Sequence, residues 1–251
     1  MQYFVSEDSV VRRIWGKGDT ILLIFAGAAA EFALNKAVDW LYFTGRLPSD
    51  PLKRLFSTVT YAREIVFSEY GVAISAIDRI SSIHRGVEVA RGMAIPDWAY
   101  RDVLFMLIDY SIRSHELLEQ PLSMSEREEV FYVFRRMGER MGIPGLPADY
   151  LAWETARLKV MEEDMVNSAY TIDLYRQYRK HLGWFRYKLL LEAQKALVPG
   201  EVNVMLRLSG NWEARLLFRT YRSLSHLRLQ NILRNAILPG TYRKQVAELD
   251  R

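Results

Sequence analysis

Apolar residues recur every three to four positions along most of the chain, which is the spacing of one face of an α-helix. Prolines and glycines are few, at eight and fourteen, and they fall singly between the periodic stretches. A turn-rich β-sandwich requires many more such breaks at short intervals. The pattern therefore predicts an all-α protein.

The breaks also predict where the helices lie. A short first helix is expected to be capped by Ser6 or Asp8 and to end near Gly16. The other helices are expected at 20–42, 51–69, 72–91, 97–120, 123–142, 148–165, 171–196 and 212–236. Because no repeat, low-complexity segment or long linker separates them, the simplest account is one globular multi-helix domain over 1–251.

The most hydrophobic run spans residues 21–34 and is interrupted by Glu31. It falls short of the roughly 20 apolar residues that a membrane-spanning helix requires, so a buried core helix is expected. Its glycine and alanine residues at 27–30 allow close approach of either another helix or a flat ligand. Three tryptophans are expected to serve packing, namely Trp98, Trp184 and Trp212.

Half of the residues are hydrophobic and a quarter are charged, the balance of an ordinary globular protein. The absence of cysteine excludes disulfides, thiolate metal sites and cysteine catalysis. The net charge of +4 is mild, so no nucleic-acid partner is expected. The N-terminal residues lack the order of a secretory signal, which favours a cytoplasmic location.

Several familiar catalytic constellations are missing from the sequence. A ferritin-like di-iron site needs a carboxylate three positions before a histidine, where this chain has Ser81, Ile112, Tyr178 and Ser223. His115 and Glu116 begin a zinc-protease motif, but its second histidine is absent. His115, His181 and His226 lie among charged residues and are assigned no site.

His84 is the histidine that the pattern singles out. It shares an apolar stripe with Ile77, Ile80 and Val87, which predicts that it faces inward. An inward histidine either forms hydrogen bonds or coordinates a metal. On the preceding helix, Arg54 and Thr58 are four residues apart and so share a face. One interpretation is that they pair with a haem propionate or a distal ligand. The other is that they are a surface arginine and an ordinary helical threonine.

The order of short motifs then becomes informative. Six of them occur in sequence: SVVRRIWG at 9–16, DPLKRLFST at 50–58, IHRGV at 83–87, LID at 107–109, PLS with ER at 121–127, and GIP leading to LP at 142–147. This order resembles the MpaB and latex-clearing-protein family, the rubber oxygenase catalytic domain. The resemblance covers a motif-bearing core at about 9–165, with a weaker helical extension at about 170–240.

The resemblance implies a haem b-dependent oxygenase with a globin-like helical core. Such an enzyme uses the haem iron and dioxygen to attack an apolar substrate, alkene-bearing or lipidic. By resemblance, His84 corresponds to the proximal iron ligand, and Arg54 and Thr58 line the distal side of the haem. Asp39, expected on the second helix, is either a base above the iron or a helix-end aspartate in water.

The chain also departs from the family pattern. Rubber oxygenases have a lysine where this chain has Ser57, and many relatives have histidines where it has Asn35 and Leu104. These departures favour an alternative, a non-catalytic protein that carries haem or a hydrophobic ligand. A third possibility concerns residues 211–236, a basic amphipathic segment that is either a peripheral membrane contact or a packed helix with a solvated arginine face.

Overall fold

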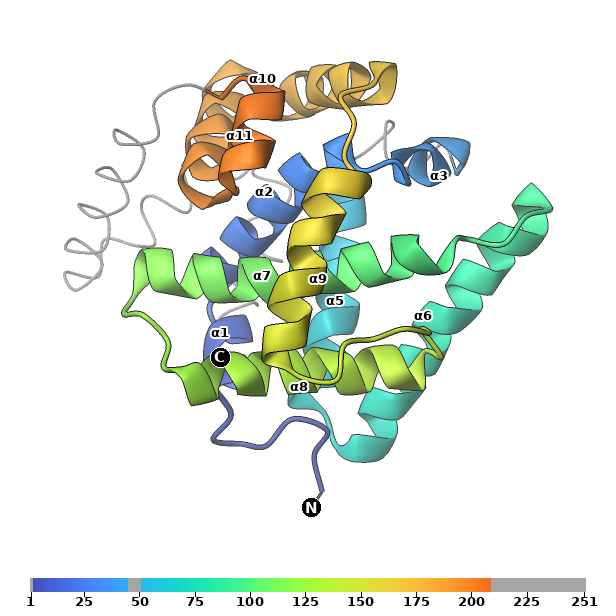
Figure 1. Cartoon of the computed structure of the whole chain (residues 1–251), viewed down its shortest axis with the longest axis vertical. Helices are drawn as coiled ribbons and strands as arrows, with labels where there is room; N and C mark the ends of the chain where they lie inside the picture. Colours follow the sequence, from blue (N-terminus) through green and yellow to red (C-terminus); the bar gives the residue numbers. More distant parts are fainter. Residues whose placement is uncertain (1, 45–50, 209–251) are drawn as a thin grey trace.

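All regular elements are α-helices in the part of the chain described by the computed structural model, residues 2–44 and 51–208, with backbone only at 51–57 (Figure 1). The helices are α1 (Val10–Trp15), α2 (Gly18–Leu34), α3 (Val38–Phe43), α5 (Pro51–Phe67), α6 (Tyr70–Arg91), α7 (Asp97–Leu118), α8 (Met124–Arg140), α9 (Tyr150–Glu163), α10 (Ala169–Leu197) and α11 (Gly200–Leu206). The prediction of an all-α, single-domain protein is confirmed. The globin-like core implied by the resemblance stays a prediction.

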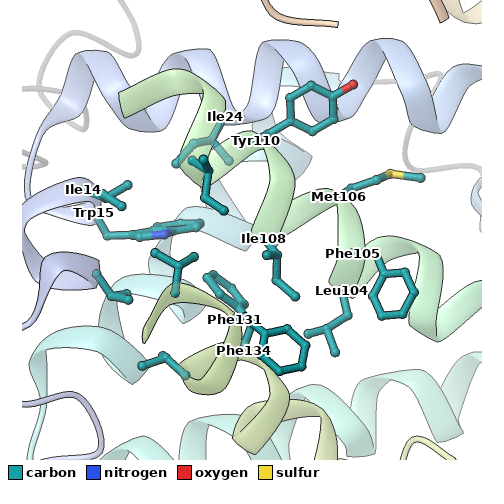
Figure 2. Close-up of a cluster of buried hydrophobic side chains, with 14 of the residues drawn as sticks. Ile14, Trp15, Ile24, Leu104, Phe105, Met106, Ile108, Tyr110, Phe131 and Phe134 are labelled. Carbon is teal, nitrogen blue, oxygen red and sulfur yellow. The ribbon is translucent and has the colours of Figure 1, made fainter. Parts of the chain in front are cut away.

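The main hydrophobic core forms between α2, α7 and α8, with α1 closing one end. Figure 2 shows its centre, where Trp15 of α1 and Ile24 of α2 meet Ile108 of α7 and Phe131 and Phe134 of α8. Each side chain of this size, when fully buried, stabilises the fold by about 1.5–3 kcal/mol. The amphipathic pattern of these helices therefore accounts for the packing.

Gly27 sits where α2 and α7 approach most closely. A Cβ atom placed on Gly27 would lie 2.2 Å from Cδ1 of Tyr110, so the aromatic ring occupies the space that a side chain would fill. Of the two interpretations of the small-residue segment at 27–30, the structure supports tight helix packing.

The expected second helix, 20–42, is in fact two helices, because the chain breaks at Asn35. Asn35 has extended backbone angles, and its Oδ1 accepts a hydrogen bond of 2.8 Å from the backbone N–H of Ala37. The carbonyl of Leu34 accepts from the N–H of Val166 at 2.6 Å. These bonds replace the helical ones, and α3 starts in a new direction.

Other boundaries differ by smaller amounts. Ser9 caps α1 in place of Ser6 or Asp8, since its Oγ accepts from the N–H of Val11. The short helix α11 was not expected. The predicted helix at 212–236, with its proposed membrane contact, lies outside the described residues.

The helix expected at 171–196 corresponds to α10, which is kinked at Gly183. The next residue, Trp184, is exposed, so the expectation that it serves packing is wrong. No helix within the described ranges is both long and apolar enough to cross a lipid bilayer.

Candidate functional site

His84 lies in the C-terminal half of α6, on the helical hairpin formed by α5 and α6. Arg54 precedes the end of α5 by 13 residues, and His84 follows the start of α6 by 14. Because the two helices run antiparallel with the same rise per residue, the two backbones are at similar heights along the hairpin.

The surroundings of His84 are more open than the apolar stripe predicted. Its side chain is half-buried, and the buried side chains of α6 are confined to the first half of the helix, at Ala73, Ala76 and Ile77. In Figure 1, α6 diverges from α5 toward its C-terminal end. His84 therefore lies at the margin of the core, where a ligand has access from outside.

Tyr100 of α7 packs against the imidazole of His84. The two rings meet edge to face, with 5.2 Å between centroids and an interplanar angle of 71°. The Tyr100 hydroxyl donates to Oε1 of Glu88 at 3.2 Å. Burial, together with the negative charge of Glu88, raises the pKa of the Tyr100 phenol well above its usual value, so this hydroxyl stays protonated. Neither Tyr100 nor Glu88 is predicted from the sequence as a site residue.

The distal-side residues predicted for the haem are on α5. Thr58 is half-buried and precedes the end of α5 by nine residues. The backbones of Arg54 and Ser57 belong to the first part of α5, and their side chains lie outside the described residues.

Asp39 is held in an ion pair. It lies on α3 instead of the expected second helix, and its Oδ2 accepts a 2.7 Å hydrogen bond from Arg91 at the end of α6. The Arg91 guanidinium also stacks over the ring of Trp40, 3.9 Å from its centroid. These contacts fasten α3 to α6, and the role of Asp39 as a base stays a prediction.

The two departures at Asn35 and Leu104 are buried in the core on α2 and α7. The Asn35 Nδ2 donates to Oδ2 of Asp102 at 2.7 Å. Leu104 packs in the apolar cluster of Figure 2, against the helix that carries Gly138. Asp102 and Tyr100 are two residues apart on α7 and point to different sides of it, so the Asn35–Asp102 pair and His84 occupy different sides of this helix.

Asp102 is a buried acid that the sequence analysis missed. Burial, opposed by the hydrogen bond from Asn35, raises its pKa to about 7. Asp102 is three or four residues from Ala99, Phe105 and Met106, which places it on the buried stripe of α7. This spacing was the sequence signal from which its burial could have been predicted.

A second buried polar group joins α2, α7 and α9, and we call it the charge cluster: Glu31, Asp109, Tyr110 and Arg157. Arg157 donates to both carboxylate oxygens of Glu31 at 2.5 Å and to Asp109 at 3.0 Å. The Tyr110 hydroxyl donates to Glu31 at 2.8 Å. Although burial alone would lower the pKa of the Arg157 guanidinium, the charges of Glu31 and Asp109 raise it, so Arg157 stays charged.

The charge cluster borders a cavity of about 230 Å³, lined in part by Asp109, Arg157 and Gly200. A larger hollow of about 640 Å³ lies at the N-terminal segment, beside Tyr3 and Arg136. His84 lines neither cavity. Groups of three or more histidine, cysteine, aspartate or glutamate side chains suited to hold a metal ion are absent from residues 2–44 and 58–208.

Comparison with known proteins identifies the family. Residues 12–227 match the model of the family described as ER-bound oxygenase mpaB/B′/rubber oxygenase, catalytic domain. The match spans most of the 251 residues, and the chain therefore belongs to this family. Neither a curated protein nor a solved structure matched. Family membership supports an oxygenase-type enzymatic function, for which dioxygen is the implied co-substrate.

Proposed function

We propose that this protein is a haem b-dependent oxygenase that binds its iron through His84 and oxidises an apolar substrate. The observation that carries the proposal is the position of His84: a half-buried imidazole at the margin of the core, packed against Tyr100, in a chain that belongs to an oxygenase family. A cytoplasmic location stays a prediction.

The donor chemistry around His84 suits a haem. The porphyrin supplies four nitrogens, so the iron needs only one or two protein ligands. A single histidine on an accessible helix margin meets that requirement, whereas iron held by side chains alone requires several ligands together. When bound, the haem would supply an iron centre able to activate dioxygen.

The residues of this chain would then act as follows. His84 would hold the iron, and the ring of Tyr100 restricts rotation of the imidazole by packing against its side. Glu88 fixes Tyr100 by accepting the hydrogen bond from its hydroxyl. Arg54 and Thr58 would orient dioxygen or the substrate from α5. The apolar side chains of Ile80 and Val87, both half-buried on α6, would limit access of water.

A visible absorption spectrum of the protein, purified from cells supplied with a haem precursor, tests the proposal. We expect a Soret band near stoichiometric haem in the wild type, lost in His84→Ala. His181→Ala is the matched control because His181 is also a half-buried helical histidine, and it should keep the band. A colourless wild type that does not take up added haem, or a band unchanged in His84→Ala, would refute the proposal.

A carrier function is the second candidate, favoured by what fills the two family histidine positions. Asn35 is committed to its bond with Asp102, and Leu104 is part of the apolar core, so neither supplies an imidazole. Oxygen uptake distinguishes the two functions. An oxygenase consumes oxygen when given alkenes or unsaturated lipids, whereas a carrier shows the haem spectrum without turnover.

A further inference from the structure

The middle of α10 is basic and free of acids. Between Asp173 and Glu192 the sequence contains five arginine or lysine residues and no aspartate or glutamate. Four of the five are exposed: Arg176, Arg179, Lys180 and Lys188. Exposed charges of one sign on a helix face attract a surface of the opposite charge.

Two exposed aromatic side chains lie in the same basic stretch of α10, directly after Gly183. Trp184 is 66% exposed and Phe185 is 54% exposed. A soluble protein usually buries such rings, since each carries a large apolar area. Two adjacent exposed rings therefore indicate a contact with something outside the chain.

Gly183 forms a kink in α10 directly before these rings. Its backbone angles, φ 72° and ψ 171°, lie in a region that is essentially restricted to glycine. They interrupt α10 just before Trp184 and change the direction of the helix. The kink thus depends on the one residue type that adopts it without strain.

The inward face of α10 has different partners. Leu174 and Tyr178 are buried against α2 and α3, and the Gln194 amide donates to the carbonyl of Ala26 at 3.1 Å. The outward positions recur at helical spacing as Ile172, Arg176, Lys180 and Gly183. In Figure 1, α10 lies along one margin of the molecule.

We propose that this face of α10 docks the protein on a membrane surface rich in anionic phospholipid. The arginines and lysines pair with phosphate and carboxylate headgroups, while Trp184 and Phe185 enter the interfacial layer, where aromatic rings are favoured. A nucleic acid fits less well, because single strands are bound in grooves and this face is the outside of one helix at the molecular margin. The exposed apolar Ile172 also suits lipid and offers nothing to a phosphate backbone.

Co-sedimentation with vesicles tests the proposal. The full chain is mixed with vesicles of phosphatidylcholine alone or with about 30% phosphatidylserine, at about 0.1 M and about 1 M salt. We expect binding to the anionic vesicles that falls at high salt. Lys180→Glu should lower the partition coefficient about tenfold, because an attraction becomes a repulsion. Lys159→Glu, an exposed lysine on α9, is the charge-matched control and should bind like wild type.

The aromatic contribution is tested separately. Trp184→Ala with Phe185→Ala should lower the partition coefficient about tenfold or more. Leu158→Ala on α9, where the leucine is 64% exposed, is the control. The emission of the wild type minus that of Trp184→Phe isolates Trp184 among the six tryptophans, and it should shift to shorter wavelength with anionic vesicles.

Three results would overturn the proposal: no binding to anionic vesicles, binding that the α10 variants leave unchanged, or binding to oligonucleotides but not to vesicles. The second result would assign membrane binding to a different segment, such as 211–236. The outcome is independent of haem binding, which is read from the absorption spectrum.

Discussion

Replacing Arg157 by methionine would remove the positive centre of the charge cluster. The Arg157 side chain is 8% exposed and Glu31 is fully buried. The variant leaves Glu31 with the Tyr110 hydroxyl as its remaining hydrogen-bond donor in this cluster. Water cannot solvate a carboxylate at that depth, so its charge becomes uncompensated.

The expected loss in the free energy of unfolding is about 3–5 kcal/mol, the usual cost of removing one partner from a buried ion pair. Arg113→Met provides the matched control. Arg113 donates to the same Asp109 at 2.6 Å, but its side chain is 41% exposed. Because Arg113 is partly exposed and Asp109 keeps Arg157 as a partner, removing this helical ion pair should cost about 0–1 kcal/mol. The two variants, with the same change in charge, should therefore differ by several-fold in their effect.

Urea unfolding followed by circular dichroism measures both losses. A further variant tests whether the unpaired charge of Glu31 causes the loss of stability. In the Arg157→Met background, Glu31→Gln removes the orphaned charge, yet the glutamine oxygen still accepts from Tyr110. The double variant should therefore be more stable than Arg157→Met alone, although Glu31→Gln should destabilise the wild type. If Arg157→Met costs no more than Arg113→Met, the cluster is solvated and the reasoning is wrong.

Three further predictions concern the fold. Gly27→Ala should lower stability by about 1–3 kcal/mol in a thermal or urea unfolding experiment, because the added Cβ would overlap the ring of Tyr110; an unchanged midpoint would contradict the close approach. Ser123→Ala should cost about 1 kcal/mol by the same measurement, since Ser123 and Glu126 form a capping box at the start of α8; a neutral effect would count against the box. In the folded protein Asp102 has a pKa of about 7, above its usual 3.8, so between these pH values the folded state binds more protons than the unfolded state. The stability of the wild type relative to Asp102→Asn should therefore fall as the pH rises from about 4 to about 7. A stability difference that is independent of pH would refute this assignment.

The helices could be predicted from the sequence because their periodicity is local. The break at Asn35 could not be predicted in this way. It depends on the hydrogen bond from Asn35 to Asp102 and on the one from Val166 to the Leu34 carbonyl, and both partners are distant in the chain. Similarly, the kink in α10 depends on a backbone conformation at Gly183 that an isolated glycine in a helical pattern does not reveal.

The candidate site was predictable only in part. His84 was found from its stripe and from the family motif, but its partner Tyr100 lies on another helix and needs the fold to be recognised. Glu31 was noted as an interruption of an apolar run, and its partner Arg157 could not be inferred from spacing. His115, assigned no site, is buried, and this burial lowers its pKa.

The hydrogen bonds between α10 and α2 bear on where this protein can be shortened. Thr171 Oγ1 donates to the carbonyl of Ala33 at 2.7 Å, and Gln194 reaches the carbonyl of Ala26. A fragment ending near residue 165 would retain the six short motifs named above but leave these carbonyls and the apolar side of α2 uncovered. Such a fragment would tend to aggregate. The helices that carry no motif are therefore needed for the motif-bearing part to fold as a stable unit.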